Sequence, residues 1–214
     1  MRTNGLQIKR FYRKALCITW KNSGPGRIVF SVLLLISLLL TGCAGNIIHL
    51  SYPTLQAPAS SGPEKDISVC VIDFTNKRNA GVIGERLSGE KILPRTPVER
   101  WLATSLAEEL KRAGYRVSTA ETLAAALAAQ PDYIVSGDAE EVWLAETSFT
   151  RYTGTIRTSI TLLDGRGDHL TSNAYNCIYS KTVLPIYGVP QTLLADALQE
   201  MLLPAVKLLH SVMR

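Results

Sequence analysis

TGTIRTSITLL, at residues 153–163, alternates apolar and polar positions, and this period of two is typical of a half-buried antiparallel strand. The next residues, DGRGD at 164–168, combine two glycines with two aspartates and predict a hairpin turn. A return strand is expected over about residues 169–181. This hairpin decides the fold class, because its alternation predicts an antiparallel sheet with one face on a core.

Two apolar segments upstream predict further strands. Residues 67–74 read ISVCVIDF and carry apolar side chains on both faces, which is typical of a central strand covered on both sides. Residues 132–146 begin DYIVSG and predict a strand, with a bulge at Gly137. Residues 75–95 contain three glycines and a proline, so they predict a long irregular connection that could contact a partner.

The best-defined helix is expected over residues 97–113. Thr96 and Glu99 predict a capping box around Pro97, and Gly114 predicts the helix end. Apolar residues recur every four positions and predict a stripe facing the core: Val98, Leu102, Leu106 and Leu110.

Two more helices complete the expected fold. A short one should follow a second capping box at residues 118–121, and a final one should begin near Pro190 and bend at Pro204. The predicted architecture is a single α+β domain over residues 66–214. It has an antiparallel sheet of four to five strands with helices packed mainly on one face.

The N-terminal region holds the most specific motif. Residues 28–45 read IVFSVLLLISLLLTGCAG, and the ending LTGC at 40–43 resembles the lipobox of bacterial lipoprotein precursors. The resemblance implies a lipidated Cys43 and a signal peptide over residues 1–42. An uncleaved transmembrane helix is the alternative, but the apolar run of residues 28–40 is shorter than the roughly 20 residues of a span.

The same motif gives an expected location. Ala44 follows the cysteine, whereas an aspartate at this position resembles an inner-membrane retention signal of enteric lipoproteins. The expected location is therefore the periplasmic face of the outer membrane, with the protein held by its lipid anchor. Residues 43–65 contain three prolines and predict a lipidated tether that holds the domain away from the bilayer. Its apolar residues Ile47, Ile48 and Leu50 could either dock on the domain or lie at the membrane.

The charge distribution argues against nucleic acid as a partner. Residues 1–42 hold seven of the 23 basic residues and no acidic residue, which leaves 16 basic against 18 acidic residues from position 43 onward. The high isoelectric point therefore belongs to the signal peptide.

Cysteine and histidine give few site candidates. Cys70 and Cys177 remain in a compartment that permits disulfides, so either a bridge or two buried thiols is consistent with the sequence. His49, His169 and His210 lie in unrelated segments and predict no metal site.

We expect no catalytic, cofactor-binding or metal-binding residues. The expected role is non-enzymatic and accessory, with an envelope protein or a lipid-like ligand as partner. The alternative is a periplasmic enzyme with an unrecognised active site.

The order of elements also resembles a group of proteins. A strand, a helix ending RAGYRV (112–117), DYIVSGDAEEVW (132–143), the hairpin LLDGRGDHL (162–170) and a terminal helix look like the YajG-like bacterial lipoproteins. The pattern is also similar to the auxiliary lipoproteins of envelope transport systems, of the LptE and PqiC type. Both resemblances imply an accessory protein without enzymatic activity, and only Cys43 carries over as a functional residue.

Overall fold

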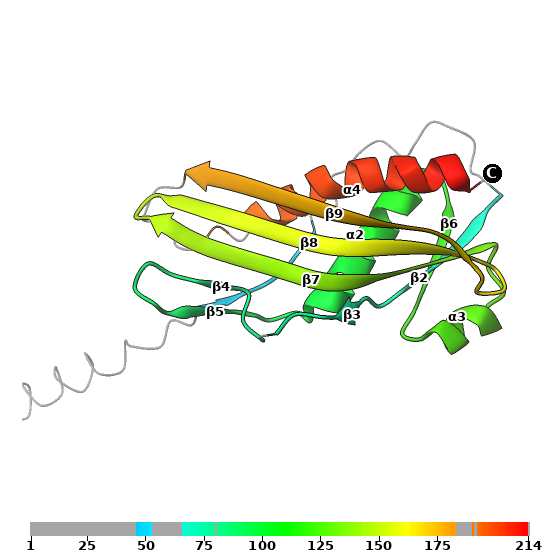
Figure 1. Ribbon diagram of the computed structural model, residues 1–214, viewed down its shortest axis with the longest axis horizontal. Helices are drawn as coiled ribbons and strands as arrows, with labels where there is room; N and C mark the ends of the chain where they lie inside the picture. Colours follow the sequence, from blue (N-terminus) through cyan, green and yellow to red (C-terminus); the bar gives the residue numbers. More distant parts are fainter. Residues whose placement is uncertain (1–45, 53–65, 80, 183–189, 191, 214) are drawn as a thin grey trace, which may run out of the picture. The chain divides into compact units, whose positions relative to one another are not determined.

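The computed structural model of the chain describes residues 46–52, 66–79, 81–182, 190 and 192–213. These residues belong to one compact unit, Asn46–Arg214, which has a mixed α+β fold (Figure 1). Its strands are β1 (Ile47–Ile48), β2 (Ser68–Ile72), β3 (Thr75–Asn76), β4 (Gly84–Glu85), β5 (Lys91–Pro94), β6 (Arg116–Ala120), β7 (Tyr133–Ser148), β8 (Arg151–Asp164) and β9 (His169–Thr182). Its helices are α2 (Val98–Arg112), α3 (Leu123–Ala128) and α4 (Leu193–Val212).

Strand β7 organises the sheet. Along one edge it pairs with β8 in antiparallel register, and β8 pairs in the same way with β9. Along the other edge it pairs in succession with β2, β3 and β4, all in parallel register. The three long strands therefore form an antiparallel meander, and the other edge of β7 carries short parallel segments.

The predicted sheet is corrected in size and direction. It has nine strands and is mixed, whereas four to five antiparallel strands were expected. The hairpin of β8 and β9 and the alternation of buried positions in β8 are confirmed. The parallel pairing of β2 with β6 arises because the connection between them, which contains β3, β4, β5 and α2, crosses over the sheet. Such a crossover returns the chain in the same direction, and no local pattern in the sequence specifies it.

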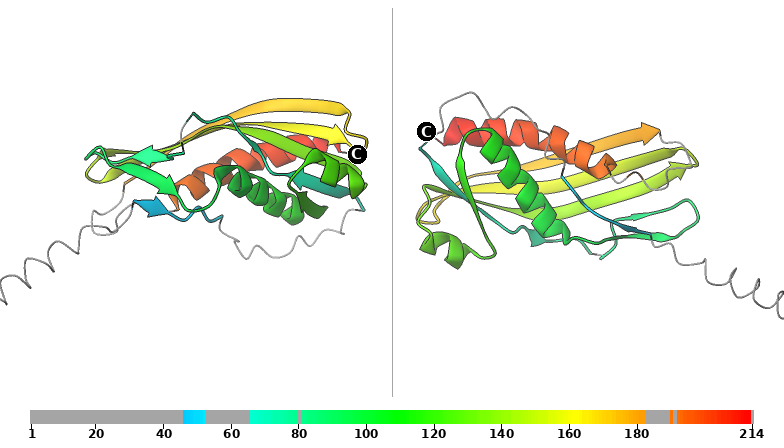
Figure 2. Two further views of the ribbon diagram at one scale, coloured as in Figure 1. Left: turned by 90° about the horizontal axis from the view of Figure 1, so that it is seen from below. Right: turned by 180° about the vertical axis from the view of Figure 1, so that it is seen from behind.

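Helices α2 and α4 lie on one face of the sheet (Figure 2). The α2 stripe is buried as expected, with Leu106 and Leu110 fully buried. The close approach of α4 depends on Gly154 of β8, where an added Cβ would lie 2.4 Å from a methyl carbon of Leu193. Helix α4 continues through Pro204 as a single helix.

The two ends of α2 differ in how well they were predicted. Gly114 adopts a φ of 90°, and Tyr115 N donates to the Leu110 carbonyl as in a Schellman motif. The predicted N-terminal capping box is wrong, because Pro97 is the N-cap and no side chain caps the helix. The carboxylate of Glu99 instead accepts a hydrogen bond from Asn76 at 3.2 Å.

The short helix α3 packs on the opposite face of the sheet. It begins after Thr122, whose hydroxyl accepts from Ala125 N at 3.2 Å, so the capping box expected at residues 118–121 is corrected. Residues 118–120 extend β6 instead. A small cluster under α3 contains the buried residues Cys70, Ile72, Ala126 and Ile134.

Two further expectations about strands are corrected. The register of β7 against β8 shifts between Ala139 and Glu141 and again between Glu146 and Ser148, not at Gly137. Gly137 is instead needed for packing, since an added Cβ would lie 2.6 Å from the Phe74 ring. Residues 75–95 are not an irregular connection, because they contain β3, β4 and β5, and Ile83 and Ile92 there are fully buried.

Candidate functional site

The start of the described chain forms an arm, residues 46–52, that is built into the sheet. Strand β1 pairs in parallel with β5, and the Asn46 carbonyl accepts from Leu93 N at 2.8 Å. Ile48 and Leu50 of the arm are each only 3% exposed. Of the two positions considered for the apolar residues of this segment, docking on the domain is therefore correct for Ile48 and Leu50, whereas Ile47 is 55% exposed. The folded unit begins near residue 46 and not at residue 66 as predicted.

Polar side chains fix both ends of this arm. At its start, Asn46 Nδ2 donates to Glu90 Oε2 at 3.1 Å, in the turn between β4 and β5. At its end, the Tyr52 hydroxyl donates to the Glu109 carboxylate on α2, which also accepts from Arg112. The Arg112 guanidinium lies 5.5 Å from the centre of the Tyr52 ring, in cation–π geometry.

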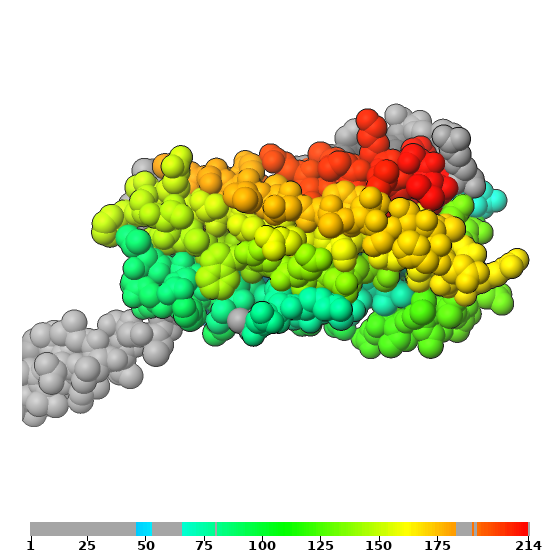
Figure 3. Space-filling view, viewed as in Figure 1, coloured from blue at the N-terminus to red at the C-terminus, as the bar shows by residue number. Residues whose placement is uncertain are grey.

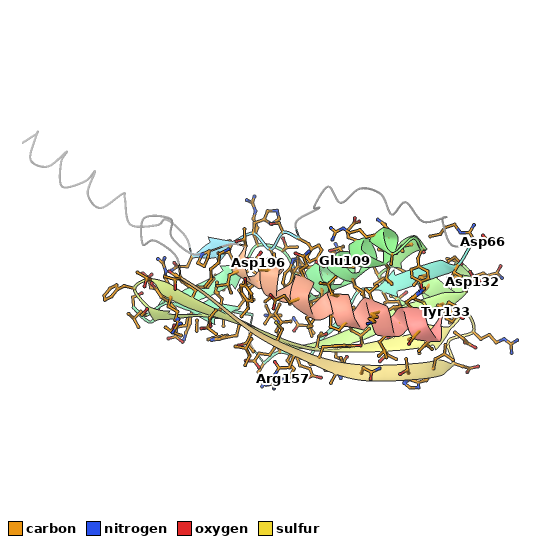
Figure 4. All side chains as sticks on the ribbon, turned by 90° about the horizontal axis from the view of Figure 1, so that it is seen from above. Asp66, Glu109, Asp132, Tyr133, Arg157 and Asp196 are labelled. Atoms are coloured by element: carbon orange, nitrogen blue, oxygen red, sulfur yellow. The ribbon has the colours of Figure 1, made fainter. Side chains whose placement is uncertain are left out.

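The cluster of Tyr52, Glu109 and Arg112 attaches the arm to α2. Burial raises the pKa of Tyr52 above its ordinary value, and the hydrogen bond and negative charge of Glu109 raise it further. Glu109 is itself only 7% exposed, and it lies on the helix side of the sheet while Arg157 lies on the opposite side (Figure 4). Since the carboxylate is already hydrogen-bonded by both neighbours, these groups clamp the arm to α2.

The β4–β5 hairpin also joins the far end of the meander. Leu87 N donates to Glu146 Oε2 at 3.2 Å, close to the turn between β7 and β8. Arg86 Nε lies 3.7 Å from the same carboxylate oxygen. Burial is the main cause of the raised pKa of Tyr152 in this cluster. These contacts place the two hairpin tips side by side at one end of the sheet (Figure 1).

That end exposes several large apolar side chains. Phe149, in the turn between β7 and β8, is 79% exposed, and Leu87 in the neighbouring hairpin is 53% exposed. Ile47 pairs with Leu93 between β1 and β5, and these two are 55% and 44% exposed. We refer to these four residues as the apolar rim.

The meander presents a second candidate surface. Within the part of the chain that is described, β9 pairs only with β8, so its other edge has no strand beside it. Its side chains alternate between half-buried and exposed, and the exposed ones include Ile178 on the outer face. Figure 3 shows this outer face, where β7, β8 and β9 lie side by side. Hydroxyl pairs cross it, such as Thr161 with Ser172 at 2.9 Å.

The structure settles only some of the predicted site residues. Cys43 lies outside the described residues. Cys70 and Cys177 are both free, which corrects the disulfide considered above. They cannot approach each other, since Cys70 packs under α3 whereas Cys177 packs against the core on the other face of the sheet.

The described residues offer no arrangement typical of a metal centre, since no three His, Cys, Asp or Glu side chains are grouped suitably. His49 contacts Thr96 and His210 contacts Tyr115, at 3.1 and 2.6 Å.

None of the described helices is long and apolar enough to cross a membrane. The clamp of Tyr52 on Glu109 was not predicted, and the only signal for it was the apolar run just before Tyr52.

Comparison with solved structures finds partial similarity at low sequence identity. Protein XCC0632 from Xanthomonas campestris, of the DUF330 family, is 15% identical, with 76% of this chain and 91% of that chain covered and a TM-score of 0.49. PelC from Paraburkholderia phytofirmans, a dodecamer, is 16% identical over 72% of this chain and 96% of that chain, with a TM-score of 0.44. Lipoprotein GNA1162 from Neisseria meningitidis is 17% identical over 68% of this chain and 98% of that chain, with a TM-score of 0.37.

The sequence itself matches no protein-family model and no curated protein. The similarity to YajG-like lipoproteins therefore stays a prediction from the order of elements.

Proposed function

We propose that this chain is a bacterial lipoprotein, held in the cell envelope through Cys43, and that it binds a partner protein and does not act as an enzyme. The observation that supports lipidation of Cys43 is the LTGC sequence at residues 40–43, directly after an apolar run. Ala44 supports the periplasmic face of the outer membrane as the location.

The free edge of β9 supports the choice of a protein as the partner. An unpaired strand edge offers a row of backbone donors and acceptors, and an extended segment of another chain can add to it. Proteins usually block such edges with charged residues, proline or bulges. Residues 170–180 of β9 contain no charged residue, no proline and no glycine. Helix α4 packs against β9, and Lys181 Nζ lies 3.1 Å from Asp196 Oδ2 of this helix. Strand addition would therefore use the part of the β9 edge that α4 leaves uncovered.

The contacts of the polar clusters favour binding over catalysis. The Glu109 carboxylate is occupied by Tyr52 and Arg112, and the Glu146 carboxylate by Leu87 N and Arg86. A catalytic acid or base must instead reach a substrate. Both clusters join separate parts of the chain, so we assign them to folding.

The anchor is tested with Cys43→Ser. We expect the native protein to show an N-terminal lipidated cysteine by mass spectrometry, and the variant to accumulate as an uncleaved precursor. A normally processed Cys43→Ser protein, released from the membrane fraction, would exclude the lipoprotein assignment.

The β9 edge is tested by photo-crosslinking in intact cells, with a photo-reactive amino acid in place of Asn176. The experiment compares the otherwise wild-type protein with two lysine variants. Ile178→Lys introduces a charge on β9, and Leu203→Lys introduces the same charge on α4, where Leu203 is 58% exposed. We expect Ile178→Lys to abolish the protein adduct and Leu203→Lys to retain it. Equal adducts in all three proteins would rule out the edge as the binding surface. Turnover of a small substrate by the purified protein would overturn the binding role itself.

A further inference from the structure

We infer that the apolar rim, formed by Ile47, Leu87, Leu93 and Phe149, is a membrane-contacting surface that rests on the lipid bilayer carrying the anchor. This inference rests on the proposed lipidation of Cys43. It goes beyond that proposal, because it assigns one end of the folded domain to the bilayer.

The length of chain between anchor and domain sets the first constraint. Asn46 is held on the domain by its carbonyl bond to Leu93 N and by its side-chain bond to Glu90, at 2.8 and 3.1 Å. Only residues 44 and 45 separate Asn46 from Cys43. Three residue steps span at most about 11 Å when fully extended. A lipidated Cys43 therefore keeps the start of β1 within a short distance of the bilayer surface.

This constraint replaces the expected tether. A free tether over residues 43–65 would have let the domain stand far from the membrane. Residues 46–52 instead pair with β5 and are clamped by Glu109, so they cannot act as a spacer. The end of the domain where the arm begins has to face the lipid.

The chemistry of that end fits a bilayer interface. The rim residues are 44–79% exposed, and exposed apolar residues gathered at one end of a domain indicate an interaction surface. Phenylalanine and leucine side chains at a membrane surface insert their apolar groups to roughly 5–10 Å, at the boundary of headgroups and acyl chains.

The charges around the rim are largely paired, which lowers the cost of bringing them near the lipid. Lys91 Nζ lies 2.6 Å from Glu85 Oε2 on the β4–β5 hairpin. Arg86 faces Glu146 at 3.7 Å, and Glu90 accepts from Asn46. Glu90 keeps its negative charge, and the exposed Arg151, two residues from Phe149, carries a positive one. The charges of these six residues sum to zero, so the rim is apolar at its tips and close to neutral behind them.

The test places a tryptophan at each end of the meander in the full-length, processed lipoprotein. Phe149→Trp lies on the rim, and Leu170→Trp lies at the start of β9, at the opposite end of the strands. Both positions are exposed, at 79% and 43%, so neither change should disturb the core. Each variant is reconstituted into vesicles of phosphatidylethanolamine and phosphatidylglycerol, with or without bromine on the upper acyl chains. The emission of the wild-type tryptophans is subtracted.

For Phe149→Trp we expect a shift of the added emission to shorter wavelength and loss of roughly half its intensity with brominated lipid, as for a side chain at the acyl boundary. For Leu170→Trp we expect neither effect. Equal quenching at the two positions, or none at Phe149→Trp in protein that sediments with the vesicles, would overturn the orientation. Sedimentation reports the anchor separately, so protein that stays in solution would reveal failure of the proposed lipidation, on which the inference depends.

Discussion

The Tyr115 hydroxyl lies 2.6 Å from Nδ1 of His210, and the two rings meet edge to face with their centres 6.0 Å apart. Tyr115 directly follows the Gly114 turn that ends α2, and His210 lies in the last turn of α4. This hydrogen bond joins two residues that lie 95 positions apart in the chain, and it therefore fixes the ends of α2 and α4 to each other. Burial raises the pKa of Tyr115 above its ordinary value.

Removing this hydroxyl tests how α4 is held. Tyr115→Phe should lower the free energy of unfolding by about 0.5–1.5 kcal/mol, the usual net contribution of one hydrogen bond. Urea unfolding monitored by circular dichroism measures the change. Tyr175→Phe is the matched control, because no hydrogen bond of its hydroxyl is found among the described residues and its pKa is raised by burial alone. Equal losses in both variants would show that the contact with His210 adds no stability.

The buried stripe of α2 makes a second prediction. Leu106 is fully buried, so Leu106→Ala should cost roughly 2–5 kcal/mol of unfolding free energy. Lys111 is exposed and pairs with Glu108 at 2.8 Å, and such surface pairs contribute less than about 1 kcal/mol. Lys111→Ala should therefore have little effect in the same urea experiment. Small changes in both variants would contradict the packing of α2 against the sheet.

The corrected segment 75–95 makes a third prediction. Ile92 of β5 is fully buried, and Ile92→Ala should cost roughly 2–5 kcal/mol, as expected for a core position. Leu87→Ala in the same hairpin should change stability by less than about 0.5 kcal/mol, because Leu87 is 53% exposed. Thermal unfolding in detergent compares the two. A tolerated deletion of residues 78–92 would contradict this assignment and restore the loop expected from the sequence.

The arm makes a prediction about alkaline pH. The pKa of Tyr52 is raised in the folded protein, so its contribution to stability is complete below the unfolded pKa of about 10 and decreases as the pH rises above that value. The stability advantage of wild type over Tyr52→Phe should therefore be constant up to about pH 9 and shrink above about pH 10. Urea unfolding across this range measures it. A difference that does not change with pH would mean that Tyr52 titrates normally and is not held by Glu109.

Local patterns in the sequence determined the elements with strong periodicity. Alternation in residues 153–163 gave β8 its buried face, with Ile156, Ile160 and Leu162 all buried. Gly114 ended α2 because only a residue that tolerates a φ of 90° closes the turn there at low cost. The LTGC motif predicts a lipidated Cys43 without any structural information, because a lipobox is a short linear sequence.

Tertiary structure alone decided the sheet and the surfaces. Strands β3, β4 and β5 are two to four residues long, too short for a periodic pattern, and they exist because β7 and the arm offer backbone groups to pair with. Thr96 and Glu99 had the residue types of a capping box, but His49 and Asn76 bind them instead. Residues 46–52 were predicted to be part of a tether but belong to the folded domain. Ile48 and Leu50 pack in the core, and the Tyr52 hydroxyl donates to the buried Glu109 carboxylate. Pairings over such distances depend on which segments meet in space, and no window of sequence contains both partners.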